Sequence, residues 1–139
     1  MNMNIYLEPV NPGDSEHVNT LFDLLHERTK DQSISHTKMP GYIRHCKFVQ
    51  SRPYRIWFLI RDLETKDIAG SVYLTKQNEI GIFVFKKYQG RHCGPAAVRM
   101  LMQEYKGPFL ANINPRNPDS IKMFVSLGFE LLQVTYNHE

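Results

Sequence analysis

The stretch from Glu79 to Ala97 constrains the fold of this 139-residue chain more than any other part of it. It reads as an apolar strand, a short basic turn, a glycine-containing loop and the first turn of a helix. The first N–H groups of a helix have no intrahelical partner, and the helix dipole favours negative charge there. Gly90 and Gly94 permit a close backbone approach, and Pro95 suits the first helical position. The segment therefore predicts a strand–loop–helix that binds a polyphosphate.

Two familiar phosphate-binding loops do not fit this segment. The dinucleotide loop needs G-x-G-x-x-G, and the nucleotide P-loop needs G-x-x-x-x-G-K followed by Ser or Thr. The spacing of Gly90 and Gly94 fits neither pattern, and no Lys-Ser or Lys-Thr dipeptide follows Gly94. The segment from Gln89 to Gly94 instead resembles the acyl-CoA loop of the GNAT superfamily of N-acyltransferases, whose pattern is Q/R-x-x-G-x-G/A. His92 stands where the family usually has its first motif glycine, a departure that the resemblance allows if the residue avoids the left-handed backbone region.

Residues 117–129 resemble a second GNAT signature, N-x-x-S-x-x-x-Y/F-x-x-x-G-F. Asn117 is a good helix N-cap, and Pro118 suits the first helical position. Gly128 ends the predicted helix, and Phe129 opens a new apolar strand. An apolar stripe at helical spacing is expected at Ile121, Phe124, Val125 and Leu127.

Length and composition favour a single GNAT-like domain over residues 1–139. The chain is 42% hydrophobic, enough for a sizeable core. No apolar run approaches 18 residues and the start lacks the regions of a signal peptide, so we expect no membrane segment. Cys46 and Cys93 match no metal spacing, which suits free thiols in a cytoplasmic protein without a metal. The net charge of +3 is mild, and basic residues that could meet CoA phosphates are Lys86, Lys87, Arg91 and Arg99.

We expect an α/β (α+β) fold with a mixed, mostly antiparallel central sheet and about four flanking helices. Asp14 or Ser15 can cap a first helix, and Pro40 precedes a second one that ends near Val49. A third helix follows Gly94. The expected strands cover residues 5–7, 54–61, 68–74, 78–85, 109–113 and 129–136. This order of elements matches that of the GNAT superfamily over nearly the whole chain.

The resemblance implies direct attack of a primary amine on the thioester of acetyl-CoA, without an acyl-enzyme. A backbone N–H of the strand, near Phe83 or Val84, would polarise the thioester oxygen. The pyrophosphate would lie on the amides between Arg91 and Ala96. The residues expected to contact the cofactor are Ile82, Phe83, Val84, Gln89, Gly90, Arg91, His92, Cys93, Gly94, Pro95, Ala96, Asn117 and Ser120.

Glu79 is the candidate general base that takes the proton from the acceptor ammonium. Strand alternation places Glu79, Gly81 and Phe83 on one face. Some relatives carry a Glu as the general base at the position of Asn112, but an asparagine side chain cannot accept a proton. The frequent tyrosine acid of the family is Phe124 here, so an acid must come from elsewhere, and the candidates are Tyr136, His36 and His45.

The acceptor side of the cleft is expected between the first two helices, in residues 27–40. This segment is rich in donors and poor in acids, with Arg28, Lys30, His36 and Lys38 as candidate contacts. It favours a small anionic or neutral polar amine, such as a nucleotide-linked amino sugar, over a polyamine. A peptide N-terminus and a catalytically impaired acyl-CoA-binding module remain alternatives. Nucleic acid is disfavoured because no stripe of basic and aromatic residues is present, and we expect a monomer or homodimer.

Overall fold

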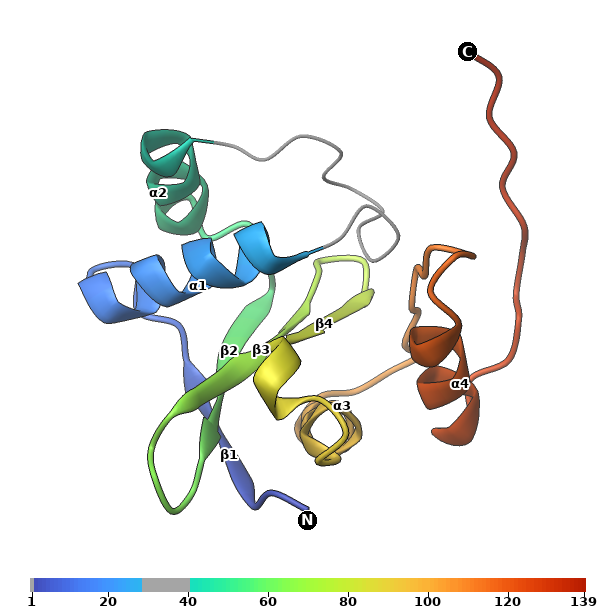
Figure 1. The fold of residues 1–139 in the computed structure, drawn as a ribbon. Coiled ribbons are helices and arrows are strands. Elements are labelled where there is room, and N and C mark those ends of the chain that lie inside the picture. The colour runs from blue at the N-terminus through green and yellow to red at the C-terminus, as the bar shows by residue number, and fades with distance from the viewer. Residues whose placement is uncertain (1, 29–40) are drawn as a thin grey trace.

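The computed structural model describes residues 2–28 and 41–139. Its centre is a four-stranded antiparallel sheet in the order β1-β2-β3-β4, with neighbours in sequence paired throughout. Figure 1 shows this sheet between helices on both sides. The strands are β1 (Ile5–Pro9), β2 (Ile56–Asp62), β3 (Ile68–Leu74) and β4 (Ile80–Val84).

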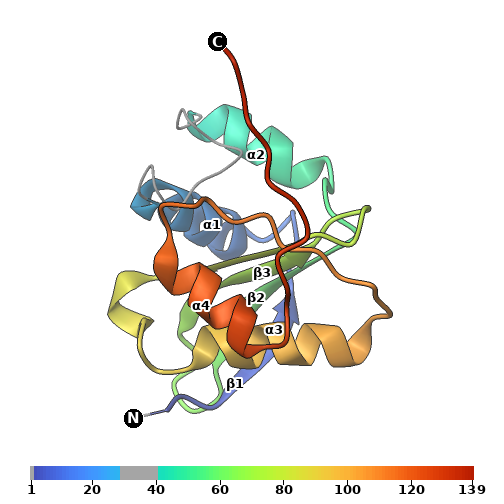
Figure 2. The ribbon, with the colours of Figure 1, turned by 90° about the vertical axis from the view of Figure 1, so that its right-hand side faces the viewer.

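Helices cover both faces of the sheet. They are α1 (Ser15–Glu27), α2 (Tyr42–Gln50), the short 3₁₀ helix η1 (Lys86–Tyr88), α3 (Cys93–Glu104) and α4 (Pro118–Ser126). Helices α1 and α2 lie on one face and α3 on the other, as Figures 1 and 2 show. No helix in the described part of the chain has the length and apolar character needed to cross a membrane.

The side chains of β2 point alternately to the two faces of the sheet, which explains why helices cover both faces. Leu59 is fully buried in a small cluster with residues of α1 and α2, whereas Phe58 and Ile60 belong to the larger cluster under α3. Successive side chains of a strand point to opposite faces, so a run of apolar residues supplies both cores. The strand therefore reads as continuously apolar because both of its faces are covered.

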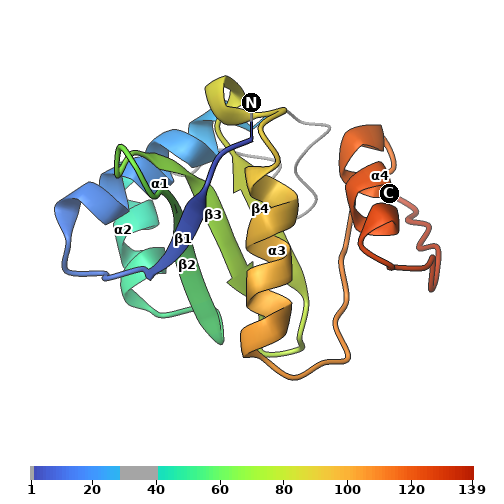
Figure 3. The ribbon, with the colours of Figure 1, turned by 90° about the horizontal axis from the view of Figure 1, so that it is seen from below.

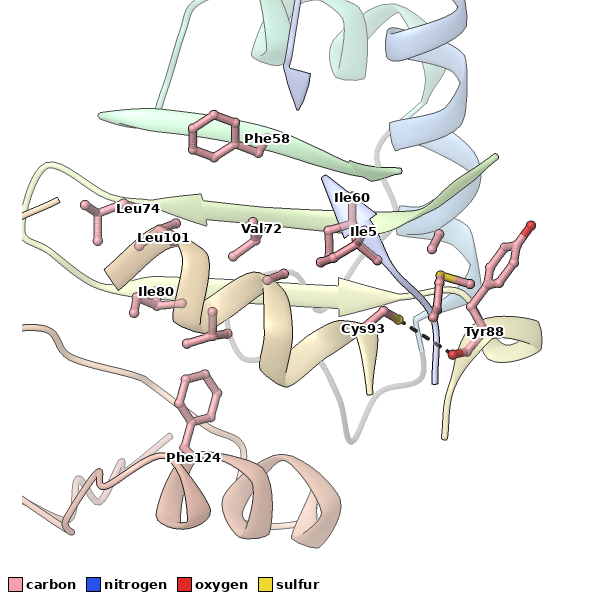
Figure 4. Close-up of a cluster of buried hydrophobic side chains, with 14 residues drawn as sticks. Ile5, Phe58, Ile60, Val72, Leu74, Ile80, Tyr88, Cys93, Leu101 and Phe124 are labelled. Atoms are coloured by element: carbon pink, nitrogen blue, oxygen red, sulfur yellow. Dashed lines mark hydrogen bonds between the residues drawn. The ribbon is translucent and has the colours of Figure 1, made fainter. Parts of the chain in front are cut away.

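The larger core connects the sheet, α3 and α4. Figure 4 shows side chains from β2, β3 and β4 packed against Leu101 of α3, with Phe124 reaching toward them from α4. Phe124 is 3% exposed. Of the expected α4 stripe, Ile121 and Val125 are exposed at 39% and 61%, so that part of the prediction was wrong. The apolar anchor of α4 is Phe124, with Met123 half-buried beside it.

Helix boundaries follow side-chain caps that the sequence predicts. Asp14 Oδ1 accepts the backbone N–H groups of Glu16 and His17 at 2.9 and 3.3 Å, so Asp14 rather than Ser15 caps α1. Asn117 Oδ1 accepts the N–H of Ser120 at 3.2 Å at the start of α4. These bonds satisfy first-turn amides that the helix itself leaves unpaired.

The expected strand over residues 109–113 is reduced to one parallel bridge. Leu110 pairs with Glu79, its N–H donates to the Asn78 carbonyl at 2.9 Å, and its carbonyl accepts the Ile80 N–H at 2.7 Å. Beyond Leu110 the chain leaves the edge of β4 without a ladder. Figure 3 shows this segment running on to α4, away from β4 and α3. The separation leaves the β4 edge open where the cleft lies.

The expected last strand, residues 129–136, is absent as well. Phe129 packs on Phe124 with ring centroids 5.1 Å apart, but the chain then extends outward, as Figure 2 shows. Leu131, Leu132 and Tyr136 are 85%, 74% and 91% exposed. A β-strand needs a partner for its backbone groups, and with residues 111–113 outside the sheet this segment has none among the described residues.

Candidate active site

A cleft of about 770 Å³ opens between β4, the start of α3 and α4. This volume is typical of small-molecule and cofactor sites. Of the predicted cofactor contacts, Arg91 and Ala96 do not line it. The remaining ones all do, namely Ile82, Phe83, Val84, Gln89, Gly90, His92, Cys93, Gly94, Pro95, Asn117 and Ser120.

The amides of β4 alternate between its two edges. The Phe85 N–H, just beyond β4, donates to the Ala69 carbonyl on the β3 side at 2.8 Å. The Phe83 amide, two residues earlier, faces the same edge because amides alternate along a strand. The Ile80 N–H donates the other way, to the Leu110 carbonyl. Only alternate amides of β4 can therefore reach a ligand outside the sheet.

Ile82 and Val84 carry the amides that face the open edge of β4. Both residues line the cleft, and no strand of the described chain pairs with that edge beyond Ile80. Of the two residues expected to polarise a thioester oxygen, Phe83 is engaged with β3, so the alternation favours Val84. Ile82 is a second donor at the same edge.

The loop between β4 and α3 is shaped by two residues with positive φ. Gly90 has φ 79°, and His92 has φ 61° and ψ 14°, which is the left-handed region. The expectation that His92 avoids this region was wrong. The His92 carbonyl accepts the Ala96 N–H at 3.2 Å as the first helical bond, and α3 begins at Cys93 rather than at Pro95.

The loop also presents unpaired backbone donors. The amides of Gly90 and His92 make no backbone hydrogen bond within the described residues. The Gln89 side chain donates from Nε2 to the Val84 carbonyl at 3.2 Å, which ties the loop to the end of β4. Because Gly94 is buried against Val84 and α4, the loop brings backbone rather than side chains to the cleft floor. Such a surface suits an anion.

Cys93 is a core thiol rather than a nucleophile. It is 2% exposed, and its Sγ lies 3.7 Å from the Tyr88 carbonyl that it bonds (Figure 4). Burial raises the pKa of the Cys93 thiol, although nearby amides and Arg91 oppose this shift. A thiol with a raised pKa forms little thiolate at neutral pH. The site therefore suits a direct transfer better than a thioester on the enzyme.

Glu79 lies half-buried in the cleft wall, just before β4. Its Oε1 accepts the Thr75 hydroxyl at 3.2 Å, and its Oε2 accepts the side-chain N–H of Asn112. The Thr75 oxygen in turn accepts the Glu79 N–H at 2.9 Å. Sequence reasoning missed Thr75 and the positioning role of Asn112. Thr75 stands at the start of the β3–β4 turn, four residues before Glu79, and that spacing was its one local signal.

A cation and two stacked phenols also line the cleft. The Arg28 guanidinium carbon lies 3.1 Å from the Phe83 ring centroid. Tyr54 and Tyr73 stack in parallel with centroids 3.8 Å apart. The Tyr73 ring crosses Gly81 so closely that a Cβ there would meet its Cζ at 2.0 Å. Burial lowers the pKa of Arg28 to about 10, opposed by the two tyrosines, and raises that of Tyr54.

Comparison with known proteins places this arrangement in a family. Residues 19–129 match the model of the acetyltransferase (GNAT) family. The chain belongs to the GNAT family. No curated protein matches the chain in the corresponding search. The GNAT fold, a mixed α/β fold with an antiparallel sheet between helices, was therefore correctly predicted from the two motifs and the order of elements.

Solved GNAT-like structures resemble the chain over most of its length. A domain from Methanocaldococcus jannaschii is 23% identical, with a TM-score of 0.75 over 93% of this chain and 90% of its own. A putative acetyltransferase of Salmonella typhimurium, solved with its cofactor acetyl-CoA, is 19% identical with a TM-score of 0.67 over 93% and 80%. A chimeric spermidine N-acetyltransferase from Vibrio cholerae is 15% identical, with a TM-score of 0.69 over 88% and 78%. These identities establish a shared fold.

The candidate acids of this GNAT chain lie away from the cleft wherever the structure describes them. Tyr136 is in the exposed C-terminal segment and does not line the cleft. His45 is buried between α1 and α2, where its Nε2–H donates to the Val18 carbonyl at 3.0 Å, and burial lowers its pKa. His36 lies outside the described residues, as do Lys30 and Lys38. The basic residues Lys86, Lys87, Arg91 and Arg99 do not line the cleft.

Proposed function

We propose that this GNAT protein is an N-acetyltransferase that moves an acetyl group from acetyl-CoA to a primary amine by direct attack. The observation that carries the proposal is the pair of outward amides on β4, at Ile82 and Val84, beside the glycine-containing loop that leads into α3. Both features line one cleft with the carboxylate of Glu79. The same cleft therefore offers a place for the thioester, the phosphates and a proton acceptor.

Acetyl-CoA would lie along the open edge of β4. Its pyrophosphate would accept hydrogen bonds from the amides of Gly90 and His92 and face the positive end of α3. The pantetheine would pair with the β4 edge as a strand would. The Ser120 hydroxyl on α4 borders the cleft, whereas the side-chain oxygen of Asn117 already caps α4. Asn117 would thus act mainly by holding the first turn of α4.

The reaction requires the acceptor nitrogen to lose a proton before or during attack. The nitrogen lone pair attacks the thioester carbonyl carbon, and the developing oxyanion is stabilised by the Val84 N–H. Collapse of the tetrahedral intermediate breaks the C–S bond and releases the CoA thiolate, and the nitrogen loses its second proton to solvent to give the amide. Glu79 takes the proton of the acceptor ammonium directly or through a water molecule. Hydrogen bonds from Thr75 and Asn112 hold that carboxylate in one orientation.

The thiolate must recover a proton from a group other than Phe124, which has no hydroxyl. Among the described residues, the candidate acids Tyr136 and His45 lie outside the cleft, so solvent is the simplest proton source. The missing phenol is also the observation that favours a second function, a CoA-binding module with impaired catalysis. Measurable turnover separates the two functions.

For the acceptor we propose a small polar amine, with a nucleotide-linked amino sugar as one member of that class. A neighbour of similar fold is a spermidine N-acetyltransferase, but the cleft of this chain carries Arg28 in its wall. A polyamine would place additional positive charge near that guanidinium. A peptide N-terminus is the remaining enzyme alternative.

Substitution of Glu79 tests the mechanism. Glu79→Gln keeps the shape of the side chain but cannot accept a proton, so kcat should fall on the order of 10²–10⁴-fold, with nearly unchanged acetyl-CoA affinity. Thiol release from acetyl-CoA, followed with a thiol reagent across pH, gives the rate, and calorimetry gives the affinity. Glu64→Gln, in the exposed β2–β3 turn, is the control. A loss below about threefold at every pH would show that Glu79 is not the base.

A further inference from the structure

Arg28 occupies an unusual position for an arginine, in the wall of the cleft just after α1. Its guanidinium lies on the Phe83 ring, with 3.1 Å between the guanidinium carbon and the ring centroid. Its Nε is buried and has no hydrogen-bond partner among the described residues. An unpaired buried donor on a charged group is costly to maintain. The described residues around Arg28 therefore offer fewer hydrogen-bond acceptors than its guanidinium has donors.

No carboxylate among the described residues neutralises Arg28. The ion pairs of the described chain join His17 and Arg61 to acids near α1 and β1. The adjacent acid, Glu27, accepts the backbone N–H of Lys86 instead. Among the described residues that line the cleft, Arg28 is the only lysine or arginine. Within the described part of the chain, the cleft thus contains one cation without a counter-ion.

Arg28 lies on the side of β4 opposite to α3. Phe83 points to the α1 face, whereas its neighbour Val84 packs against Gly94 and the core under α3. The loop amides that suit the cofactor phosphates belong to the start of α3. The Arg28 face instead carries the stacked Tyr54 and Tyr73. This division favours the acceptor, rather than the cofactor, as the ligand of Arg28.

Resting on the proposed acetyl transfer, we propose that Arg28 binds an oxyanion group of the acceptor, a carboxylate or a phosphate, while the acceptor amine lies toward Glu79. A guanidinium presents a planar fork of donors that matches either anion in two parallel hydrogen bonds. Glu79 at the other end of the same strand face suits the ammonium. The acceptor is then a molecule with a primary amine and an anionic group on one chain.

The spacing along β4 sets the separation of the two groups. Phe83 follows Glu79 by four positions, which corresponds to about 13 Å between their Cα atoms at the usual strand rise. The Tyr73 ring covers the intervening Gly81. This distance suits an acceptor whose two charges are several bonds apart better than an α-amino acid, whose charges are adjacent. A polyamine would instead put an ammonium beside Arg28.

Matched acceptors test the proposal through acetyl-CoA-dependent thiol release. One pair is 6-aminohexanoate against hexylamine, and the other is 6-aminohexyl phosphate against 6-aminohexanol. In the parent protein, at least one anionic member should have a kcat/KM about 10–100-fold above its neutral partner, the worth of a charged hydrogen bond. The pair with the larger ratio identifies the anion. Equal kcat/KM within both pairs would overturn the proposal.

Arg28 variants assign the preference to this side chain. Arg28→Gln should bring kcat/KM for the anionic amine down to that of its neutral partner, mainly through KM. Arg28→Lys should retain part of the preference, and Arg44→Gln on exposed α2 is the control. An equal loss of kcat/KM for the anionic amine and its neutral partner in Arg28→Gln would overturn the proposal. Weaker acetyl-CoA binding by this variant in calorimetry would also overturn it, because Arg28 would then act on the cofactor. If Arg28→Gln fails to fold, the parent's acceptor preference decides. A parent that does not bind acetyl-CoA would refute the proposed function, whereas acetyl transfer without anion preference refutes this inference alone.

Discussion

Truncation of Phe124 should cost this protein a large part of its stability. The ring is 3% exposed and packs edge-on against Phe129, with centroids 5.1 Å apart and planes at 80°. Burial of a phenylalanine side chain is worth about 1.5–3 kcal/mol, and the cavity left by truncation adds to the loss. We therefore expect Phe124→Ala to lower the free energy of unfolding by about 3–5 kcal/mol. Natural domains have about 5–15 kcal/mol in total.

Urea unfolding followed by circular dichroism measures this loss. Val125→Ala is the matched control on the same helix, because Val125 is 61% exposed and its truncation should change stability by less than about 0.5 kcal/mol. Acetyl-CoA affinity should also fall in Phe124→Ala, since α4 borders the cleft through Asn117 and Ser120. Equal urea midpoints for Phe124→Ala and the parent would show that α4 is not held by this ring.

Substitutions at two further positions test separate parts of the structure. A Cβ on Gly94 would lie 3.5 Å from Met123 Sδ and 3.6 Å from Val84 Cγ2, so Gly94→Ala should keep acetyl-CoA affinity within about threefold. Gly94→Val adds two methyl groups to this contact and should weaken acetyl-CoA binding by about tenfold or more in calorimetry. Equal acetyl-CoA affinities of Gly94→Val and the parent would show that the cofactor does not approach the backbone closely at Gly94. His45→Ala removes the buried hydrogen bond to the Val18 carbonyl and should cost about 0.5–1.5 kcal/mol in urea unfolding. Burial lowers the pKa of His45 from 6.5, so its contribution is present above pH 6.5 and is lost as pH falls through the folded pKa. The parent should therefore lose more stability than the variant between pH 7.5 and 5, and parallel pH profiles would contradict this role.

Local patterns predicted the parts of the fold that local physics determines. Residues 68–74 were predicted as a strand with the bounds that β3 has. The N-caps at Asp14 and Asn117 were predicted because a short polar side chain before an amphipathic run satisfies the first amides of a helix. The strand–loop–helix around Gly90 was also predicted, since its glycine spacing and its order of elements are properties of one segment.

The predictions that failed depend on partners far away in the sequence. Residues 129–136 have strand-like composition, but pairing requires a neighbouring strand that the chain after Leu110 does not provide. Likewise, the contact of Arg28 with Phe83 joins residues from α1 and β4 and has no local signal. His92 adopts a left-handed backbone because the loop must turn sharply into α3, and histidine is among the residues enriched there.

The central claim is that acetyl-CoA binds along the open edge of β4. Site-resolved amide hydrogen exchange, measured by NMR with and without saturating acetyl-CoA, tests it directly. The amides of Gly81 and Phe83 face β3 and should be protected in both states, whereas those of Ile82 and Val84 should become protected only when the cofactor is bound. Unchanged exchange at Ile82 and Val84 in the presence of bound acetyl-CoA would contradict the account.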